Sequence, residues 1–302
     1  MAEFFRRFLA DVRRAAGELK EDARQIGRYV LSTESHVYAF AVAANVLLSF
    51  WPFMLVLIAV FRNVFGWPAA VTALYATIQD FFAGETGRFL AYNLEVVTQW
   101  RRQVEWLSLL LLLFTANGVF LPLEVALNRA WGATENRSLL RNQLVSMGLI
   151  FLCGTLALFS AALTGAGVQV WEAFFGPAGT SAPFVIKMIA KAASLPVTIL
   201  VMFLIYAYLP NTPVPKIAIL PRVVVVGLVL ELLKWVNLAI WPWLFRKFDR
   251  EFGVFKHSVT ILTWSFFAAM VVLAGAEWIA WRVRPKLDQD TVEPGGNPCL
   301  NK

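Results

Sequence analysis

Charged residues are scarce in this chain. Of its 302 residues, 16% are Asp, Glu, Lys or Arg, whereas 59% are hydrophobic. A water-facing surface needs more polar material than this, and soluble domains carry about 25% charged residues. The shortage excludes an ordinary soluble globular domain and indicates a chain that is surrounded by lipid.

Histidine and cysteine are rarer still, with two of each, namely His36, His257, Cys153 and Cys299. They form no Cys-x-x-Cys pair and no His pair at metal-binding spacing. The sequence also has no Walker loop, no Gly-x-Ser-x-Gly, no His-Glu-x-x-His and no dinucleotide fingerprint. We therefore expect no metal, no cofactor and no enzymatic activity.

Long stretches without charge predict membrane spans, because a transmembrane helix needs about 20 consecutive apolar residues. We predict an all-α fold, a polytopic membrane helical bundle with about six transmembrane helices in a membrane domain of residues 36–286. The predicted spans cover residues 40–61, 106–127, 143–164, 190–209, 223–245 and 259–281.

The segments between and beyond the spans have patterns of their own. In residues 1–35, apolar residues at helical spacing with basic residues opposite predict an amphipathic helix. Such a helix either lies in the headgroup plane or packs on the protein's own cytoplasmic face, and the sequence favours neither. Residues 69–82 predict a second amphipathic helix at the outer surface, residues 246–258 a loop, and residues 287–302 a disordered cytoplasmic tail.

Basic residues give the chain a net charge of +7. Most of them lie beside the apolar runs, where topology signals and contacts with lipid headgroups explain them. We therefore expect membrane lipids, and no nucleic acid, as partners. The strongly basic first segment predicts cytoplasmic N- and C-termini.

Two charged residues interrupt the fifth predicted span. Glu231 and Lys234 are three residues apart on one side of a helix, with Asn237 a further three along. A charge at the centre of a span costs roughly 2.5–3.5 kcal/mol on insertion scales, so these residues predict either a polar path or an ion pair that fixes helix packing. The sequence leaves both alternatives open.

Other polar residues in the predicted spans are weaker candidates. Asn117 and Glu124 share one face of the second span, although Glu124 is close enough to its end to reach the interface. Glu277 near the end of the sixth span has the same two interpretations. A further set, expected to kink and pack the first span, consists of Asn45, Ser49 and Pro52.

Five short motifs follow one another between residues 35 and 282. They are Leu48-Ser49-Phe50-Trp51-Pro52, Leu127-Asn128-Arg129-Ala130-Trp131-Gly132, Leu209-Pro210-Asn211, Glu231-Leu232-Leu233-Lys234 and Gly275-Ala276-Glu277. In this order they resemble the YihY/BrkB family. Two positions depart from the family's pattern, since Lys256-His257-Ser258 replaces Tyr-Gly-Ser and Arg222 rather than Gly follows Pro221.

The resemblance implies a multi-pass protein of the bacterial inner membrane. Members have been labelled ribonuclease BN or virulence factor BrkB, and some are linked to export of envelope lipids. Our leading hypothesis is a transporter or exporter of a lipid or other envelope amphiphile. The alternative is a non-catalytic scaffold for envelope assembly, with a homo-oligomer or an assembly partner. A membrane-bound ribonuclease is the weakest hypothesis, because the chain lacks the His/Asp clusters that hold catalytic metals.

Overall fold

The structure is a computed structural model that describes residues 17–82, 85–98, 119–133, 144–149, 151–156 and 194–292. Within these ranges the elements are helices and no strand occurs, which confirms the all-α fold. The main helices are α2 (Thr33–Ala59), α3 (Pro68–Phe81), α4 (Glu85–Thr98), α8 (Ser194–Tyr208), α9 (Lys216–Phe252) and α10 (Lys256–Val292). Three more helical stretches cover residues 17–30, 119–131 and Leu144–Leu156, the last with a gap at residue 150.

Two of the described helices are long and apolar enough to cross a membrane, Thr33–Asn63 and Lys256–Arg284. A third candidate is the bent pair Lys216–Asn237 and Ala239–Phe252. These helices contain the first, fifth and sixth predicted spans. Parts of the second, third and fourth predicted spans lie outside the described residues, so the total of about six stays a prediction.

Helix α2 begins where its sequence supplies a cap. The Ser32 side chain accepts a hydrogen bond from the amide of Ser35, and Glu34 lies in the first turn, where a negative charge is favourable. Pro52 was expected to kink or break this span, but α2 continues through it to Ala59 and ends in a π-helical turn, Val60–Val64.

The structure at the tip between α9 and α10 differs from the sequence prediction. A loop was predicted for residues 246–258, whereas α9 runs to Phe252, a 3-10 turn covers Gly253–Phe255 and α10 starts at Lys256. Gly253 ends α9 with a φ of 51°, a conformation that glycine adopts without strain. The charged residues before it end the apolar run but do not stop a helix.

Helix α10 is also longer than predicted. It continues to Val292, so residues 287–292 are helical where a disordered tail was expected, and residues 293–302 lie outside the described part of the chain. Pro285 lies within α10 without ending it, and Pro294, Gly295 and Gly296 follow Val292.

Helix α9 is bent by 56° between Asn237 and Ala239. Pro242 lies inside the helix four residues after position 238. A proline ring clashes with the carbonyl four residues earlier and removes its hydrogen bond, which accounts for a bend at this point.

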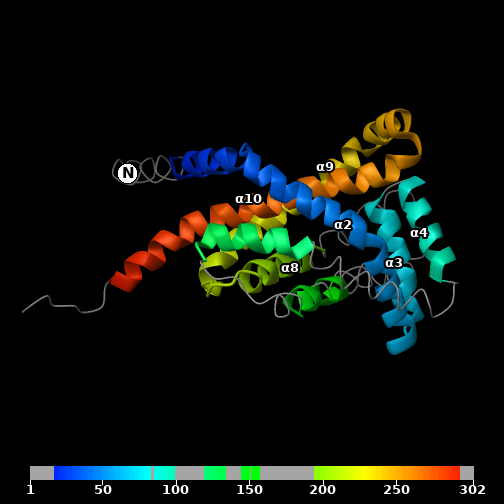
Figure 1. Ribbon diagram of the computed structural model, residues 1–302, viewed down its shortest axis with the longest axis horizontal. Coiled ribbons are helices and arrows are strands. Elements are labelled where there is room, and N and C mark those ends of the chain that lie inside the picture. The colour runs from blue at the N-terminus through cyan, green and yellow to red at the C-terminus, as the bar shows by residue number, and fades with distance from the viewer. Residues whose placement is uncertain are drawn as a thin grey trace, which may run out of the picture.

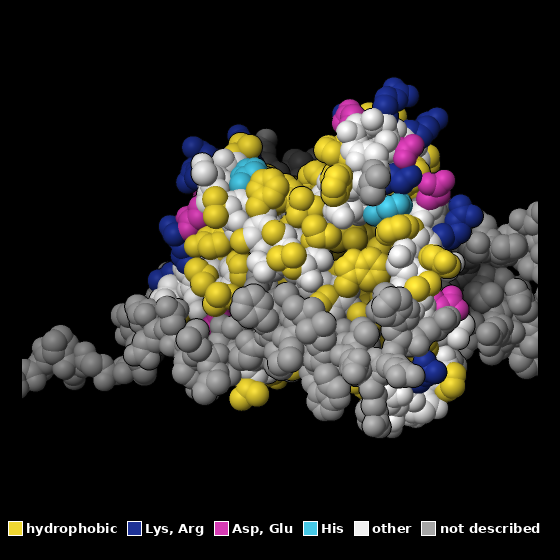
Figure 2. All heavy atoms as spheres, turned by 45° about the vertical axis from the view of Figure 1, so that its right-hand side comes forward, with side chains coloured by type: hydrophobic (Ala, Val, Ile, Leu, Met, Phe, Trp, Pro, Cys, Tyr) yellow, Lys and Arg dark blue, Asp and Glu magenta, His cyan; other side chains and the backbone are white. Residues whose placement is uncertain are grey.

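The long helices α2, α9 and α10 run together along the molecule, with α10 packed against both of the others (Figure 1). Helix α8 forms a hairpin with α9, and α3 and α4 lie at the end opposite the N-terminus. We call this the hairpin end, because it contains the tip between α9 and α10. We call the opposite end the motif end, because the motifs with Arg129 and Asn211 meet there. On the face shown in Figure 2, hydrophobic side chains fill the middle and charged ones gather toward the sides.

Helices α3 and α4 occupy the long predicted connection between the first two spans. The helix predicted at residues 69–82 is α3, whereas α4 was not predicted. Both cover the second half of α2 in one apolar cluster with buried members Phe50, Leu57, Ile58, Phe61, Leu74, Ile78, Phe82, Leu90, Leu94 and Ile261. The hairpin end therefore has a hydrophobic core of its own.

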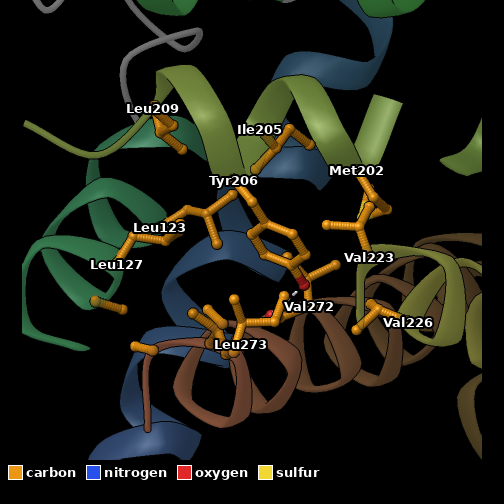
Figure 3. Close-up of a cluster of buried hydrophobic side chains, with 14 of the residues drawn as sticks. Leu123, Leu127, Met202, Ile205, Tyr206, Leu209, Val223, Val226, Val272 and Leu273 are labelled. Carbon is orange, nitrogen blue, oxygen red and sulfur yellow. Dashed lines mark hydrogen bonds between the residues drawn. The ribbon is translucent and has the colours of Figure 1, made fainter. Parts of the chain in front are cut away.

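Tyr206 lies at the centre of the main core, among side chains from four helices (Figure 3). The residue is 1% exposed, and its hydroxyl donates a 2.7 Å hydrogen bond to the carbonyl of Val272 in α10. Gly275 lies one turn further along α10, where a Cβ atom would stand 2.7 Å from this hydroxyl and 2.6 Å from a methyl group of Val226. The absence of a side chain at Gly275 thus allows α8 and α9 to approach α10.

We predict that Gly275→Ala lowers the free energy of unfolding by about 1–3 kcal/mol, because the added methyl group overpacks a filled core. Thermal unfolding of purified protein in detergent measures the effect. Gly148→Ala is the control, since Gly148 is exposed in a helix with nothing within 4 Å of an added Cβ. A Gly275 variant that unfolds at the same temperature as the control would contradict this packing.

Candidate functional site

The charged pair predicted in the fifth span forms an ion pair. Lys234 Nζ lies 2.8 Å from Glu231 Oε2, and the same ammonium group donates to Thr198 Oγ1 in α8 at 3.3 Å. The pair therefore joins α9 to α8. Thr198 was not among the residues predicted from the sequence, because a threonine in an apolar helix carries no signal of its own.

A close helix contact sets the position of this pair. At Gly227, one turn before Glu231, a Cβ atom would stand 2.7 Å from the Ile199 side chain. Small residues let helix backbones approach closely in a membrane. Because Ile199 follows Thr198, the contact at Gly227 holds the threonine hydroxyl within reach of Lys234.

The pair is only partly enclosed. The side chain of Glu231 is 14% exposed and that of Lys234 is 38% exposed. Asn237, expected on the same path, is 8% exposed and lies directly before the bend of α9. Among the described residues, its side-chain oxygen has no hydrogen-bond partner. The structure thus places Asn237 on the packed side of α9, one turn after Lys234.

The remaining predicted residues lie apart from the pair. Asn117 is outside the described residues. Glu124 is 3% exposed on the helix at 119–131, so it is buried and does not reach the surface. In α2, the Asn45 amide donates to the Ala41 carbonyl at 2.8 Å and the Ser49 hydroxyl to the Val46 carbonyl at 3.3 Å, both within the helix. Pro52 is buried within α2.

The motif end brings together two motifs that are far apart in the sequence. The Asn128 side-chain oxygen accepts a 2.6 Å hydrogen bond from the backbone amide of Asn211. Asn128 is 5% exposed. The bond therefore fixes the Leu209-Pro210-Asn211 turn between α8 and α9 to the helix at 119–131.

A second polar group at the motif end centres on Glu34 at the start of α2. Its carboxylate forms an ion pair with Arg129 and accepts a 3.2 Å hydrogen bond from the Tyr38 hydroxyl. Burial, followed by the nearby carboxylates of Glu277 and Glu34, raises the pKa of Tyr29 well above its ordinary value. Glu34 and Arg129 were not predicted as site residues, because their charges lie outside the spans and resemble ordinary topology signals.

The helix at 17–30 packs on the protein. Asp22 Oδ1 lies 2.6 Å from Arg282 Nε in α10, and the same guanidinium group donates to the Glu18 carbonyl at 3.0 Å. Tyr29 and Val30 contact the main core. Of the two placements left open by the sequence, these contacts favour packing on the protein for this part of the segment.

Polar contacts at the hairpin end hold α4 against the tip between α9 and α10. Lys256 forms ion pairs with Asp249 at 2.6 Å and with Glu85 at 3.2 Å. The ring of His257 stacks on Phe89 at 4.3 Å between centroids, and its Nδ1 lies 2.9 Å from the hydroxyl of buried Thr86.

The described residues contain no group of three or more His, Cys, Asp or Glu side chains that could hold a metal ion. Between the described helices α8 and α9, an ammonium group, a carboxylate and a hydroxyl lie in contact.

We predict that Asn128→Ala lowers the free energy of unfolding by about 1–3 kcal/mol, because it removes a buried acceptor from the Asn211 amide. Chemical denaturation in mixed micelles measures the change. The control is Asn93→Ala, whose side-chain amide bonds only within its own helix, to Phe89, and is expected to change stability by about 0.5 kcal/mol or less. Equal effects of the two variants would refute the role given to Asn128.

Comparison with known proteins supports the membrane assignment. Residues 29–294 match the family model described as virulence factor BrkB. A UPF0761 membrane protein from Chromohalobacter salexigens is 26% identical over 248 residues, which cover 80% of this chain and 58% of that protein. The chain thus matches only part of the length of this relative. No solved structure matches the chain.

Proposed function

We propose that this chain, which belongs to the virulence factor BrkB family of membrane proteins, is a transporter or exporter of a lipid or other envelope amphiphile. Its location would be the bacterial inner membrane, with both termini in the cytoplasm. No catalytic step is proposed, and a ribonuclease role finds no support among the described carboxylates and histidines. The substrate would interact with Glu231 and Lys234.

The observation that carries this proposal is a partly exposed ion pair close to a bend in a spanning helix. Lys234 lies one turn before the point where α9 turns by 56°, and its side chain is 38% exposed. Transporters often bind their substrates at interrupted helices near the middle of the membrane. A purely structural ion pair needs neither exposure nor a bend.

We predict that Glu231→Gln and Lys234→Met each slow lipid movement by about tenfold, equivalent to ~1.4 kcal/mol on the barrier. Either change leaves the remaining charge without its partner in a low-dielectric layer. The protein is reconstituted into vesicles that contain a fluorescent phospholipid, and the fraction accessible to an added quencher is followed with time.

Matched controls are available on the same helix. Glu251→Gln and Lys247→Met change the same residue types at exposed positions beyond the bend, and both should move lipid at the wild-type rate. Wild-type protein with no more flux than empty vesicles would reject the transport proposal. Variants of the pair that retain the full rate would reject the role of the pair.

The scaffold hypothesis has a separate observation in its favour. The helix at 17–30 is fixed to α10 through Asp22 and Arg282, yet Leu19 remains 70% exposed and Leu31 83% exposed. A docked helix with exposed apolar residues is able to contact an envelope-assembly partner or a second copy of the chain.

If the scaffold hypothesis holds, Asp22→Arg should abolish in-cell crosslinks from a photoreactive residue at position 19 to a partner, because the charge reversal releases the helix. The double change Asp22→Arg with Arg282→Asp should restore them. Crosslinks that persist unchanged in the single variant would show that the docked position is not what a partner recognises.

A further inference from the structure

We infer that a water molecule binds inside the bundle at the bend of α9, held between the side chains of Asn237 in α9 and Trp264 in α10. Trp264 belongs to none of the sites predicted from the sequence. The inference does not depend on the proposed transport, because it concerns how the bent helix is kept stable inside the membrane.

Asn237 and Trp264 each carry a buried polar atom that lacks a protein partner. The two residues are 8% and 9% exposed. Within the described part of the chain, neither the side-chain oxygen of Asn237 nor the indole nitrogen of Trp264 has a hydrogen-bond partner. The first atom is an acceptor and the second a donor. Burial of either atom costs free energy unless another group bonds to it, so both call for an explanation.

Helical spacing places the two residues at the same level on facing sides of α9 and α10, which pack against each other (Figure 1). The register of the two helices is fixed at Gly275, where an added Cβ atom would stand 2.6 Å from Val226. Asn237 comes eleven residues after Val226, and Trp264 comes eleven residues before Gly275. Eleven residues are about three turns, so each residue lies on the side of its helix that makes this contact.

The contacts of the neighbouring residues agree with this placement. Phe266 in α10 lies 4.4 Å, between ring centroids, from Phe40 in α2. Two residues correspond to about 200° around a helix, so Trp264 points away from α2. On α9, Asn237 comes two turns after the buried Leu230, on the core side of that helix.

The bend of α9 supplies a second acceptor. Pro242 lies inside the helix and has no N–H group, so the carbonyl of Leu238 has no helical donor four residues later. Leu238 directly follows Asn237. Two acceptors and one donor are therefore expected close together, at a point where α9 turns by 56°.

Water is the ligand that matches this set of groups. It donates two hydrogen bonds and accepts others, and a buried water molecule typically has two to four polar partners. A metal cation would bind the two oxygens but not the indole N–H. The indole and the Asn237 side chain do not bond to each other directly, and one water molecule spans a donor and an acceptor that are too far apart for a direct bond.

The bound water gives the bend a physical basis. Proline is tolerated in membrane helices when another group satisfies the backbone that it leaves unpaired, and ordered water is one such group. Asn237 and Trp264 both lie inside predicted spans, 223–245 and 259–281. The site therefore provides hydrogen bonds where the surrounding lipid offers none.

The first measurement uses the full chain in lipid bilayers with isotope-labelled tryptophan, and solid-state NMR follows transfer of magnetisation from water to the indole N–H groups. The signal that disappears in Trp264→Phe identifies Trp264 among the 12 tryptophans. We expect this buried indole to receive magnetisation from water and to lose most of it in Asn237→Leu. Asn45→Leu should leave the transfer unchanged, because the Asn45 amide bonds to the Ala41 carbonyl within α2.

The second measurement is a double-mutant cycle on the equilibrium constant of unfolding in mixed micelles. Asn237→Leu and Trp264→Phe each leave the other group buried without its shared water, so each should raise the constant by roughly tenfold or more. The double change should raise it by about tenfold less than the product of the two single effects. Asn45→Leu combined with Trp264→Phe should give the full product.

Three results would overturn the inference: no transfer from water to Trp264 in the wild type, full transfer in Asn237→Leu, or independent effects in the cycle. The wild-type measurement decides even if a variant fails to fold. Sodium or potassium chloride then replaces choline chloride as the only salt. A Trp264 signal that shifts and saturates with either cation would show an ion in place of water. Neither measurement involves lipid flux, so failure of the transport proposal would leave this result unchanged.

Discussion

A polar group that leaves water for hydrocarbon loses its hydrogen bonds unless the protein replaces them. The described helices are arranged around such replacements. The hydroxyl of Tyr206 in α8 meets the carbonyl of Val272 in α10, and the ammonium group of Lys234 meets Glu231 in its own helix and Thr198 in α8. Each contact is possible only because a glycine nearby lets two helices approach. Burial of these polar groups therefore depends on close helix packing.

At both ends of the bundle, charged and polar side chains likewise contact partners from other segments. At the motif end, Glu34 pairs with Arg129, and Asn128 holds the turn between α8 and α9. At the hairpin end, Lys256 joins α4 to α9 and α10. These contacts tie segments that are far apart in the sequence, so the two ends are fixed while the middle of α9 combines an ion pair with a bend.

Helix α9 has three different sides, and its proposed role follows from them. One side packs on the core and one exposes apolar residues, and the ion pair lies at the border with α8. Pro242 bends the helix just beyond the pair by disrupting the hydrogen bond of an earlier carbonyl. The ion pair therefore lies where α9 meets α8, one turn before the bend.

Hydropathy and spacing were enough to determine the helical class, the position of the long apolar helices at the first and sixth predicted spans and the pairing of Glu231 with Lys234, because each depends on residues close together in the chain. The same signals misplaced the loop at 246–258, since charge ends an apolar run without ending a helix. Thr198, Asn128 with Asn211, and Glu34 with Arg129 were decided only by tertiary structure. Their partners come from distant segments, and nothing local in the sequence records which helices will meet.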